Sequence, residues 1–219
     1  MHIIDKEQER REAQKNPETK QKEKIRKLLY GVGIAIFLVA AFFYYRSPSY
    51  TGTPHTMQIA GQTIEPGETT VQQLAENGFE IENGKFLNKK QVYDIAASTM
   101  MGKSYSDLFM LTKDSKSYAT IVIVNEDSGE KPLSQCKVRE ISVSEYYMDY
   151  ENLIVDGMKL SELTVPLLTE SNGKPYDNYT SALPEGGTVE TTVWEDKHYG
   201  IEIEVGGEGT VRRVVLSYE

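Results

Sequence analysis

One run of apolar residues limits the fold of this chain more than any other feature. Residues 28–45 read LLYGVGIAIFLVAAFFYY, 18 positions without a charged residue, Asn, Gln or Pro. An α-helix of that length rises about 27 Å, close to the roughly 30 Å hydrocarbon core of a bilayer. Its Leu, Ile, Val and Phe residues favour insertion into lipid, and its terminal Tyr residues suit the membrane interface. The run therefore predicts a transmembrane helix over 28–45.

Two other interpretations of this run are a buried core helix and a cleaved signal peptide. The core helix of a soluble protein normally has a polar stripe, which the run lacks. The run is also longer than the roughly 7–15 apolar residues of a typical signal peptide. Bulky residues, Phe42 to Tyr45, stand where small residues would precede a cleavage site, and the only Cys is Cys136, so a lipoprotein cysteine is absent. We therefore expect an uncleaved anchor.

The basic residues beside the run predict its orientation. Five of them precede it closely: Lys20, Lys22, Lys24, Arg26 and Lys27. After the run, Arg46 is the only basic residue before Lys85. Because Lys and Arg near a membrane helix stay on the cytoplasmic side, we expect a cytoplasmic N-terminus. The expected location is the cell membrane, crossed once, with the C-terminal body extracytoplasmic.

The segments on either side of the run read as a tail and a spacer. Residues 1–27 hold nine basic and six acidic side chains and few apolar ones, which predicts a charged, solvated cytoplasmic tail. Such a tail serves as a plain topology signal, docks a cytoplasmic factor or grips anionic lipid. Residues 46–55, RSPSYTGTPH, are rich in Ser, Thr, Pro and Gly and predict a short spacer.

The remaining body is strongly acidic. After residue 46 the chain has 14 basic and 27 acidic residues, a net charge of −13. Nucleic acid is therefore not an expected partner, because its binding requires Lys and Arg to displace counterions. A basic protein, a divalent cation or a basic wall component would suit this charge, and the charge also serves solubility alone.

Alternating apolar residues predict several strands in the body. The predicted strands span residues 118–124, 136–143, 188–194, 199–205 and 210–218, and the last two are joined by a turn over 206–209. Short helical patterns follow glycines twice, at 70–74 after Gly67 and at 160–163 after Gly157, with Thr70 or Ser161 as candidate caps. We therefore expect an α+β body of short helices packed on antiparallel sheets. It forms either one domain or two similar halves, 56–148 and 149–219.

A resemblance to a known family begins at the second glycine. The residues Val155-Asp-Gly-Met-Lys-Leu-Ser-Glu-Leu163, then Asn172-Gly-Lys-Pro175 and late hairpin strands, resemble the SmpA/OmlA type of small envelope lipoprotein domain and the repeats of the β-lactamase inhibitor protein. The likeness covers about 65 residues, with Lys159 where Thr is usual and without the lipidated Cys. The overall layout is similar to that of membrane-anchored proteins exported by Gram-positive clostridia. These resemblances imply a binding or scaffold domain without catalysis.

Motifs of catalysis are missing from the sequence. It has no HExxH, CxxC or GxSxG, and the glycines at 206–209 lack the Lys-Ser/Thr of a phosphate loop. Cys136 opens a predicted strand, so we expect a buried structural thiol rather than a nucleophile paired with His198, which stands at a hairpin turn. Trp194 is expected to be a core or strand residue rather than a platform for a sugar. The sequence therefore assigns no catalytic, cofactor-binding or metal-binding residues.

An acidic stretch rich in Tyr, 140–156, allows three interpretations. Its members are Glu140, Glu145, Asp149, Glu151 and Asp156, with Tyr146, Tyr147 and Tyr150 between them. The carboxylates would suit Ca²⁺, but the ligand order of an EF-hand is absent. The rings would suit a recognition face, because Tyr is common at binding hot spots. The plainest interpretation is an exposed strand edge with part-buried rings.

The sequence therefore predicts a membrane-anchored extracytoplasmic protein of the cell envelope that binds or scaffolds and does not catalyse. Its expected partner is a protein or a cell-wall component, and its contact with the lipid bilayer is through 28–45. The first alternative is a transmembrane signalling regulator, whose outer body senses and whose basic tail docks a cytoplasmic factor. The second alternative is a metal-dependent hydrolase that uses the acidic stretch.

Overall fold

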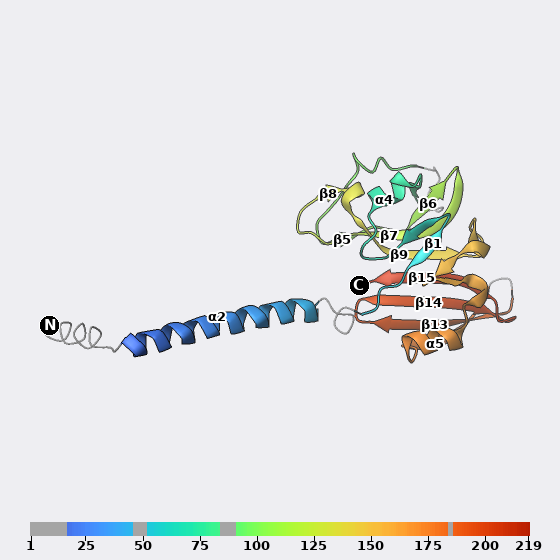
Figure 1. Ribbon diagram of the computed structural model, residues 1–219. Helices are drawn as coiled ribbons and strands as arrows, with labels where there is room; N and C mark the ends of the chain where they lie inside the picture. The colour runs from blue at the N-terminus through green and yellow to red at the C-terminus, as the bar shows by residue number, and fades with distance from the viewer. Residues whose placement is uncertain (1–16, 46–51, 84–90, 184–185) are drawn as a thin grey trace. The chain divides into compact units, whose positions relative to one another are not determined.

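The computed structural model describes residues 17–45, 52–83, 91–183 and 186–219, and it divides the chain into two units, Met1–Tyr50 and Thr51–Glu219 (Figure 1). In the first unit, helix α2 spans Pro17–Tyr45. Pro17 is its first residue, a position where the missing N–H of proline costs nothing. Most of the predicted tail, 1–16, and residues 46–51 of the predicted spacer lie outside the described residues.

Helix α2 contains a segment that is long and apolar enough to cross a membrane. It spans Ile25–Tyr45, 21 residues, and includes the whole predicted span 28–45. The helix also continues through the charged residues 17–27, whose Lys, Glu and Gln favour helix. By length and composition this segment is compatible with either a membrane anchor or a signal sequence.

The second unit is built on two antiparallel sheets. Among the described residues, the larger sheet has nine strands in the order β12-β13-β14-β15-β9-β7-β6-β3, with β5 paired to β7. These strands are β3 (Glu80–Asn83), β5 (Ser104–Tyr105), β6 (Phe109–Lys113), β7 (Lys116–Asn125), β9 (Lys137–Ser144), β12 (Asp177–Ala182), β13 (Thr188–Asp196), β14 (Tyr199–Gly206) and β15 (Val211–Tyr218). The smaller sheet has the order β11-β10-β1-β2, formed by β11 (Met158–Lys159), β10 (Ile154–Val155), β1 (Met57–Ile59) and β2 (Gln62–Ile64).

The body is mostly sheet, which corrects the expectation of an α+β mixture. In its described part the α-helices are α4 (Val71–Glu76), which contacts the 3-10 turn Leu133–Gln135, and α5 (Val165–Asn172), which lies beside β13 in Figure 1. Short 3-10 turns add η1 (Leu133–Gln135), η2 (Tyr150–Asn152) and η3 (Leu160–Glu162), and β4 (Thr99–Met100) pairs with β8 (Lys131–Pro132). Helix is scarce because the apolar spacing that suggests it lasts only one or two turns at each place, whereas the alternating runs last up to nine or ten residues.

The predicted strands are confirmed, and the structure adds others. Strands β7, β13, β14 and β15 contain or closely match the predicted ranges, and β9 begins one residue after Cys136. Strands β6 and β12 do not alternate in burial, since β6 has three buried residues in succession and β12 has none. Apolar and polar residues alternate along a strand only where one face is buried and the other is exposed to solvent. Strands β6 and β12 therefore have no alternating pattern from which they could be predicted.

The helix caps agree with the sequence at one site and differ at the other. Thr70 caps α4 as predicted: its Oγ1 accepts a bond from Gln73 N at 3.3 Å, and its own N–H donates to Gln73 Oε1 at 2.7 Å. Ser161 does not begin an α-helix but lies in η3. The cap of α5 is Thr164, whose Oγ1 accepts a bond from Leu167 N at 3.3 Å. The α-helix starts this late because Pro166 is tolerated only in a first turn.

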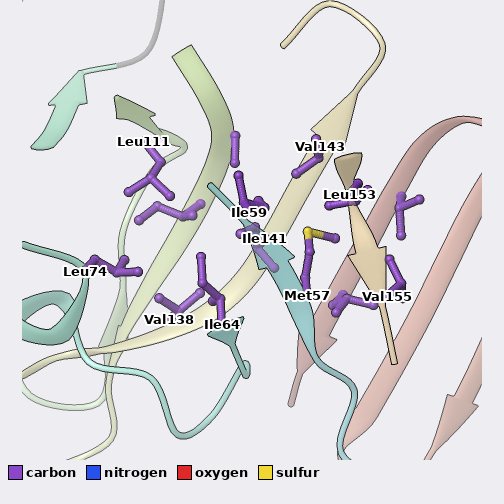
Figure 2. Packing of buried hydrophobic residues seen from close by; sticks show 14 of the residues in the cluster. Met57, Ile59, Ile64, Leu74, Leu111, Val138, Ile141, Val143, Leu153 and Val155 are labelled. Carbon is purple, nitrogen blue, oxygen red and sulfur yellow. The ribbon is translucent and has the colours of Figure 1, made fainter. Parts of the chain in front are cut away.

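The core lies between the two sheets. Figure 2 shows Met57 and Ile59 of β1 among Ile141 of β9 and Val155 of β10, and each of these four side chains is at most 2% exposed. The cluster continues to Trp194 in β13 and Leu168 in α5, so one core lies under strands from both predicted halves. Burial of this single cluster is the main stabilising force of the body.

The order of elements in the body repeats. Each part runs through a hairpin, a short α-helix and a set of strands of the large sheet, five in the first part and four in the second, and the two sets meet where β9 pairs with β15. The two hairpins turn at Ala60-Gly61 and Asp156-Gly157, with positive φ angles of 48° and 81°, and of 50° and 79°. These are the backbone angles that two-residue hairpin turns require. Gly157 therefore corresponds to Gly61, whereas the sequence pattern had aligned it with Gly67.

Candidate functional site

Two carboxylates of the acidic stretch 140–156 form hydrogen bonds within the body. Asp156 Oδ1 accepts a bond from Thr56 N at 2.7 Å, and its Oδ2 lies 2.7 Å from His55 Nδ1. Asp149 Oδ2 accepts a bond from Ala60 N at 3.0 Å, which fixes the first hairpin turn. Among the described residues, no three His, Cys, Asp or Glu side chains are grouped as a metal site would require. These carboxylates join the chain near 55–60 to the second half of the body.

The tyrosines of the same stretch do not form a common face. Tyr146 is 74% exposed, Tyr147 is half-buried and Tyr150 is buried. The Tyr150 hydroxyl donates to Val211 O at 2.7 Å, and burial raises the pKa of Tyr150 well above its usual range. Glu145 forms an ion pair with Arg212, which also donates to the Tyr146 hydroxyl at 3.1 Å. The rings are partly buried, as in the plainest of the three interpretations, but the stretch is not a strand edge, because β9 pairs with both β15 and β7 and turns follow it.

The end of the predicted spacer is attached to the body. Thr53 N donates to Asp196 Oδ2 at 3.1 Å, and His55 is only 4% exposed. Residues 53–55 are therefore part of the folded unit, which shortens the spacer expected over 46–55. The sequence missed this because Thr, Pro and His give no sign of burial until Asp156 and Asp196 are brought beside them.

Cys136 and Trp194 are buried, as the sequence predicted. The Cys136 thiol lies 3.6 Å from Pro132 O, and burial raises its pKa, which favours the protonated and unreactive form. His198 lies in the hairpin turn, with Nδ1 2.8 Å from Glu219 O. Trp194 Nε1 donates to Gly173 O at 3.2 Å, at the end of α5. The Cys136 thiol is therefore a buried member of the core.

A pocket in the first half of the body was not foreseen from the sequence. It has a volume of about 440 Å³ and is lined by Tyr93, residues 98–101, residues 104–107, Phe109 and Leu133. Met100 and Leu133 are buried members of the core, whereas Met101 and Tyr105 are 75% and 68% exposed. The pocket therefore combines buried apolar residues, polar lining residues such as Ser104 and Asp107, and an apolar rim in contact with solvent. Its volume is in the range of binding sites for small ligands or inserted side chains.

An irregularity of the large sheet creates one wall of this pocket. Both β5 and β6 pair with the same strand, β7, with Tyr105 opposite Val124 and Phe109 opposite Ile121. The chain thus takes four steps from 105 to 109 where β7 takes three, so one residue is in excess and the strand bulges. Ser106 anchors the bulge, since its N donates to Ile123 O at 2.8 Å and its Oγ accepts from Ile123 N at 2.9 Å.

Asn125 holds the opposite wall. Its side chain is fully buried, and its Nδ2 lies 2.9, 3.1 and 2.9 Å from the carbonyl oxygens of Met100, Met101 and Gly129. Gly102 packs so closely on this segment that an added Cβ would lie 2.4 Å from the Ser128 backbone. Buried polar bonds of this kind are costly to break, so the pocket is preformed.

The aromatic rings at the pocket are also fixed in orientation. Tyr93 and Phe109 are in contact, with ring centroids 4.9 Å apart. The Arg139 guanidinium lies 5.1 Å from the Tyr105 ring centroid, a favourable cation–π position. Val92 and Leu108, which neighbour lining residues along the chain, are 48% and 44% exposed. Exposed apolar side chains of this kind beside a pocket are features of interaction sites.

The face of the large sheet that points away from the core carries a cluster of polar side chains. Arg213 lies 2.5 Å from Glu204 Oε1 and 3.5 Å from Glu202 Oε1, and its Nε donates to Ser142 Oγ at 3.0 Å. Met110, Val189 and Val215 are buried on this side but do not belong to the core cluster. Desolvation raises the pKa of Glu202, with Arg213 opposing the shift. The charged side chains of this cluster therefore bond to one another and to Ser142 across neighbouring strands.

Comparison with protein-family models, with curated proteins and with solved structures finds no match to this chain. The resemblance to the SmpA/OmlA and β-lactamase-inhibitor-protein domains stays a prediction.

Proposed function

We propose that this protein is a single-pass, membrane-anchored binding protein of the cell envelope, with a cytoplasmic N-terminus and an extracytoplasmic body that docks another protein. The observation that supports it best is the preformed pocket at Tyr93, 98–101, 104–107, Phe109 and Leu133, with its exposed apolar rim. The Ile25–Tyr45 segment supplies a helix of membrane-spanning length and composition. Binding without catalysis is favoured because the hydroxyls of two lining serines, Ser104 and Ser106, donate to backbone carbonyl oxygens rather than to a base.

The rim of the pocket favours a protein partner over a wall polymer. Met101 and Tyr105 are exposed, and Met is a side chain that adapts to protein surfaces while Tyr is frequent at hot spots. An apolar side chain of the partner would enter the space above Met100 and Leu133. The net charge of −13 after residue 46 favours a partner with a basic surface around that side chain.

A photo-cross-linking experiment in intact cells tests this proposal. A benzophenone amino acid would replace Tyr105 at the rim, and a control would carry it at the exposed Glu208, in the β14–β15 turn. We expect one discrete cross-linked protein from position 105 and none from 208. The variant M101E in the same background should reduce the yield about tenfold or more, because it buries a charge at the interface.

The matched control for that variant is M148E. Met148 is 43% exposed, and the pocket-lining residues do not include it. M148E should leave the cross-link yield unchanged. Equal losses in M101E and M148E, or equal cross-linking from 105 and 208, would contradict docking at the pocket.

The membrane topology has its own test. Protease added to intact cells should remove the body and leave a fragment that contains α2, and the mass of the untreated protein should include residues 1–45. A protected body would contradict the orientation. A soluble protein trimmed after the apolar segment would identify that segment as a signal sequence and reject the anchor.

The second candidate function is a transmembrane signalling regulator. The observation in its favour is that α2 continues without interruption from Pro17 to Tyr45, so the charged turns are helical with the apolar ones. Deletion of residues 2–19, with Lys20 to Lys27 retained, should then abolish recruitment of a cytoplasmic partner and leave insertion intact. Unchanged recruitment would reject this alternative.

A further inference from the structure

The two edge strands of the large sheet, β3 and β12, differ in whether another segment of chain is hydrogen-bonded to their outer side. At one edge, the segment 91–93 covers β3: Asn83 N donates to Gln91 O at 3.0 Å, and Tyr93 N donates to Ile81 O at 2.9 Å. At the other edge, β12 pairs with β13, and no other described strand pairs with it. All six residues of β12 are exposed.

Strand β12 carries little of the usual protection of an edge: Asp177 is its only charged residue, and its Oδ1 accepts a bond from Asn178 N at 2.8 Å. It contains no Lys and no Pro, and its pairing with β13 runs without a bulge from Asp177–Val193 to Ala182–Thr188. Edge strands normally carry such features because a regular, open edge accepts another strand. The features present are those of a strand that pairs further.

We propose that β12 pairs antiparallel with β12 of a second copy of this chain, so that one sheet continues through two bodies. The two copies are related by a two-fold axis perpendicular to the sheet, so corresponding faces of the two bodies lie on the same side of the joined sheet. Side chains alternate between the faces along a strand, so residues that pair across the axis must both have odd numbers or both have even numbers. Centred on Tyr179, the pairing sets Tyr179 against Tyr179 of the partner, Asn178 against Thr180 and Asp177 against Ser181. The register pairs two aromatic rings on the axis, a favourable cross-strand contact.

The charges near β12 fit a second copy. Asp177 is the only charged residue of the strand, and in this register it faces Ser181 rather than another carboxylate. On the next strand, Glu190 lies opposite Thr180 and bonds to Asn178, so it meets no carboxylate across the new pairing. Tyr179, 46% exposed in one copy, would be covered on the axis. Self-pairing therefore meets no like charge at any position, although each body is acidic as a whole.

Disulfide trapping of the full chain in lipid vesicles tests the register. In a C136S background, Y179C sets the new thiols directly across the axis, within the roughly 4.4–6.8 Å Cα separation of a disulfide. The matched control T180C sets them about 8 Å apart or more, beyond that range, because each residue advances about 3.4 Å along a strand. We expect a disulfide dimer from Y179C and little from T180C, with Trp194 fluorescence unchanged in both.

Two charge variants, made in the Y179C chain, test the same register without depending on the geometry of the disulfide alone. S181D sets two carboxylates opposite each other and should reduce dimer yield at least about fivefold, whereas S181K meets Asp177 and should restore or raise it. Equal yields from Y179C, T180C and an exposed E208C control would overturn the proposal, as would equal yields from S181D and S181K. The cross-link from position 105 is measured separately, in intact cells, so failure of the disulfide dimer in vesicles is separable from failure of the proposed function.

Discussion

At the scale of single residues, the fold depends on polar side chains whose tertiary hydrogen bonds the sequence does not indicate. Asp149 and Asp156 stand in turns and Asn125 ends a strand before a loop, places where Asn and Asp are common for local reasons. In the structure, each bonds to backbone groups outside its own turn or strand, and Asn125 is fully buried while doing so. Their role follows from the contacts that the fold brings to them rather than from their type.

Asn125 gives the clearest prediction at this scale. N125A removes a buried amide that bonds three carbonyl oxygens, so it should lower the free energy of unfolding by about 2–3 kcal/mol. Denaturant unfolding followed by Trp194, the only Trp, measures this. A loss below that of S106A, which removes one side-chain acceptor of the same pocket, would contradict it.

Glu202 gives a prediction with a pH dependence. Its folded pKa is raised above the unfolded value, so the folded state binds the proton more tightly and stability falls as pH rises through that range. E202Q should therefore raise the denaturation midpoint at pH 7 and flatten the pH profile on the acid side. E204Q, which removes the closer ion pair of Arg213, should not raise it. Equal shifts from both variants would contradict this reading of the cluster.

At the scale of elements, helix starts depend on which capping residue the local chain can use. The sequence offered Ser161, but a 3-10 turn occupies that segment and Thr164 caps α5 instead. The strands with alternating burial were predictable because a half-covered strand carries its own signal. The edge strand β12 and the buried β6 carry none, since their environments are uniform on both faces.

The cap of α5 is open to a direct comparison. T164A should lower the free energy of unfolding by about 1 kcal/mol, because it leaves the Leu167 N–H without its acceptor. S161A should change stability by less than about 0.5 kcal/mol, the usual range for an exposed position without such a bond. Thermal unfolding of both variants by circular dichroism decides between the two caps.

At the scale of the whole molecule, the two halves of the body complete each other's sheets. β9 pairs with β15 in the large sheet, and β1 pairs with β10 in the small one, so each sheet is completed only when both halves are present. Figure 2 shows Ile141 of β9 in the same core as Val155 of β10. The repeated order of elements is thus built into one compact unit, Thr51–Glu219.

We therefore expect the body to unfold in one transition and its halves not to fold alone. A fragment of residues 149–219 would expose the buried Val214 and Leu216 together with the unpaired edge of β15. It should give the circular dichroism spectrum of an unfolded chain, whereas residues 52–219 should give that of a sheet protein. A folded, cooperatively melting 149–219 fragment would contradict the shared core.

The sequence by itself determined the apolar helix, the alternating strands and the absence of familiar catalytic motifs, because each of these is expressed within a short stretch of chain. A helix satisfies its own backbone bonds locally, and a half-covered strand shows its two faces in its residue order. Only the tertiary structure decided the order of the strands, the partners of Asp156 and the pocket held by Asn125. These depend on residues tens of positions apart meeting in space, and nothing in the local pattern of either partner specifies the other.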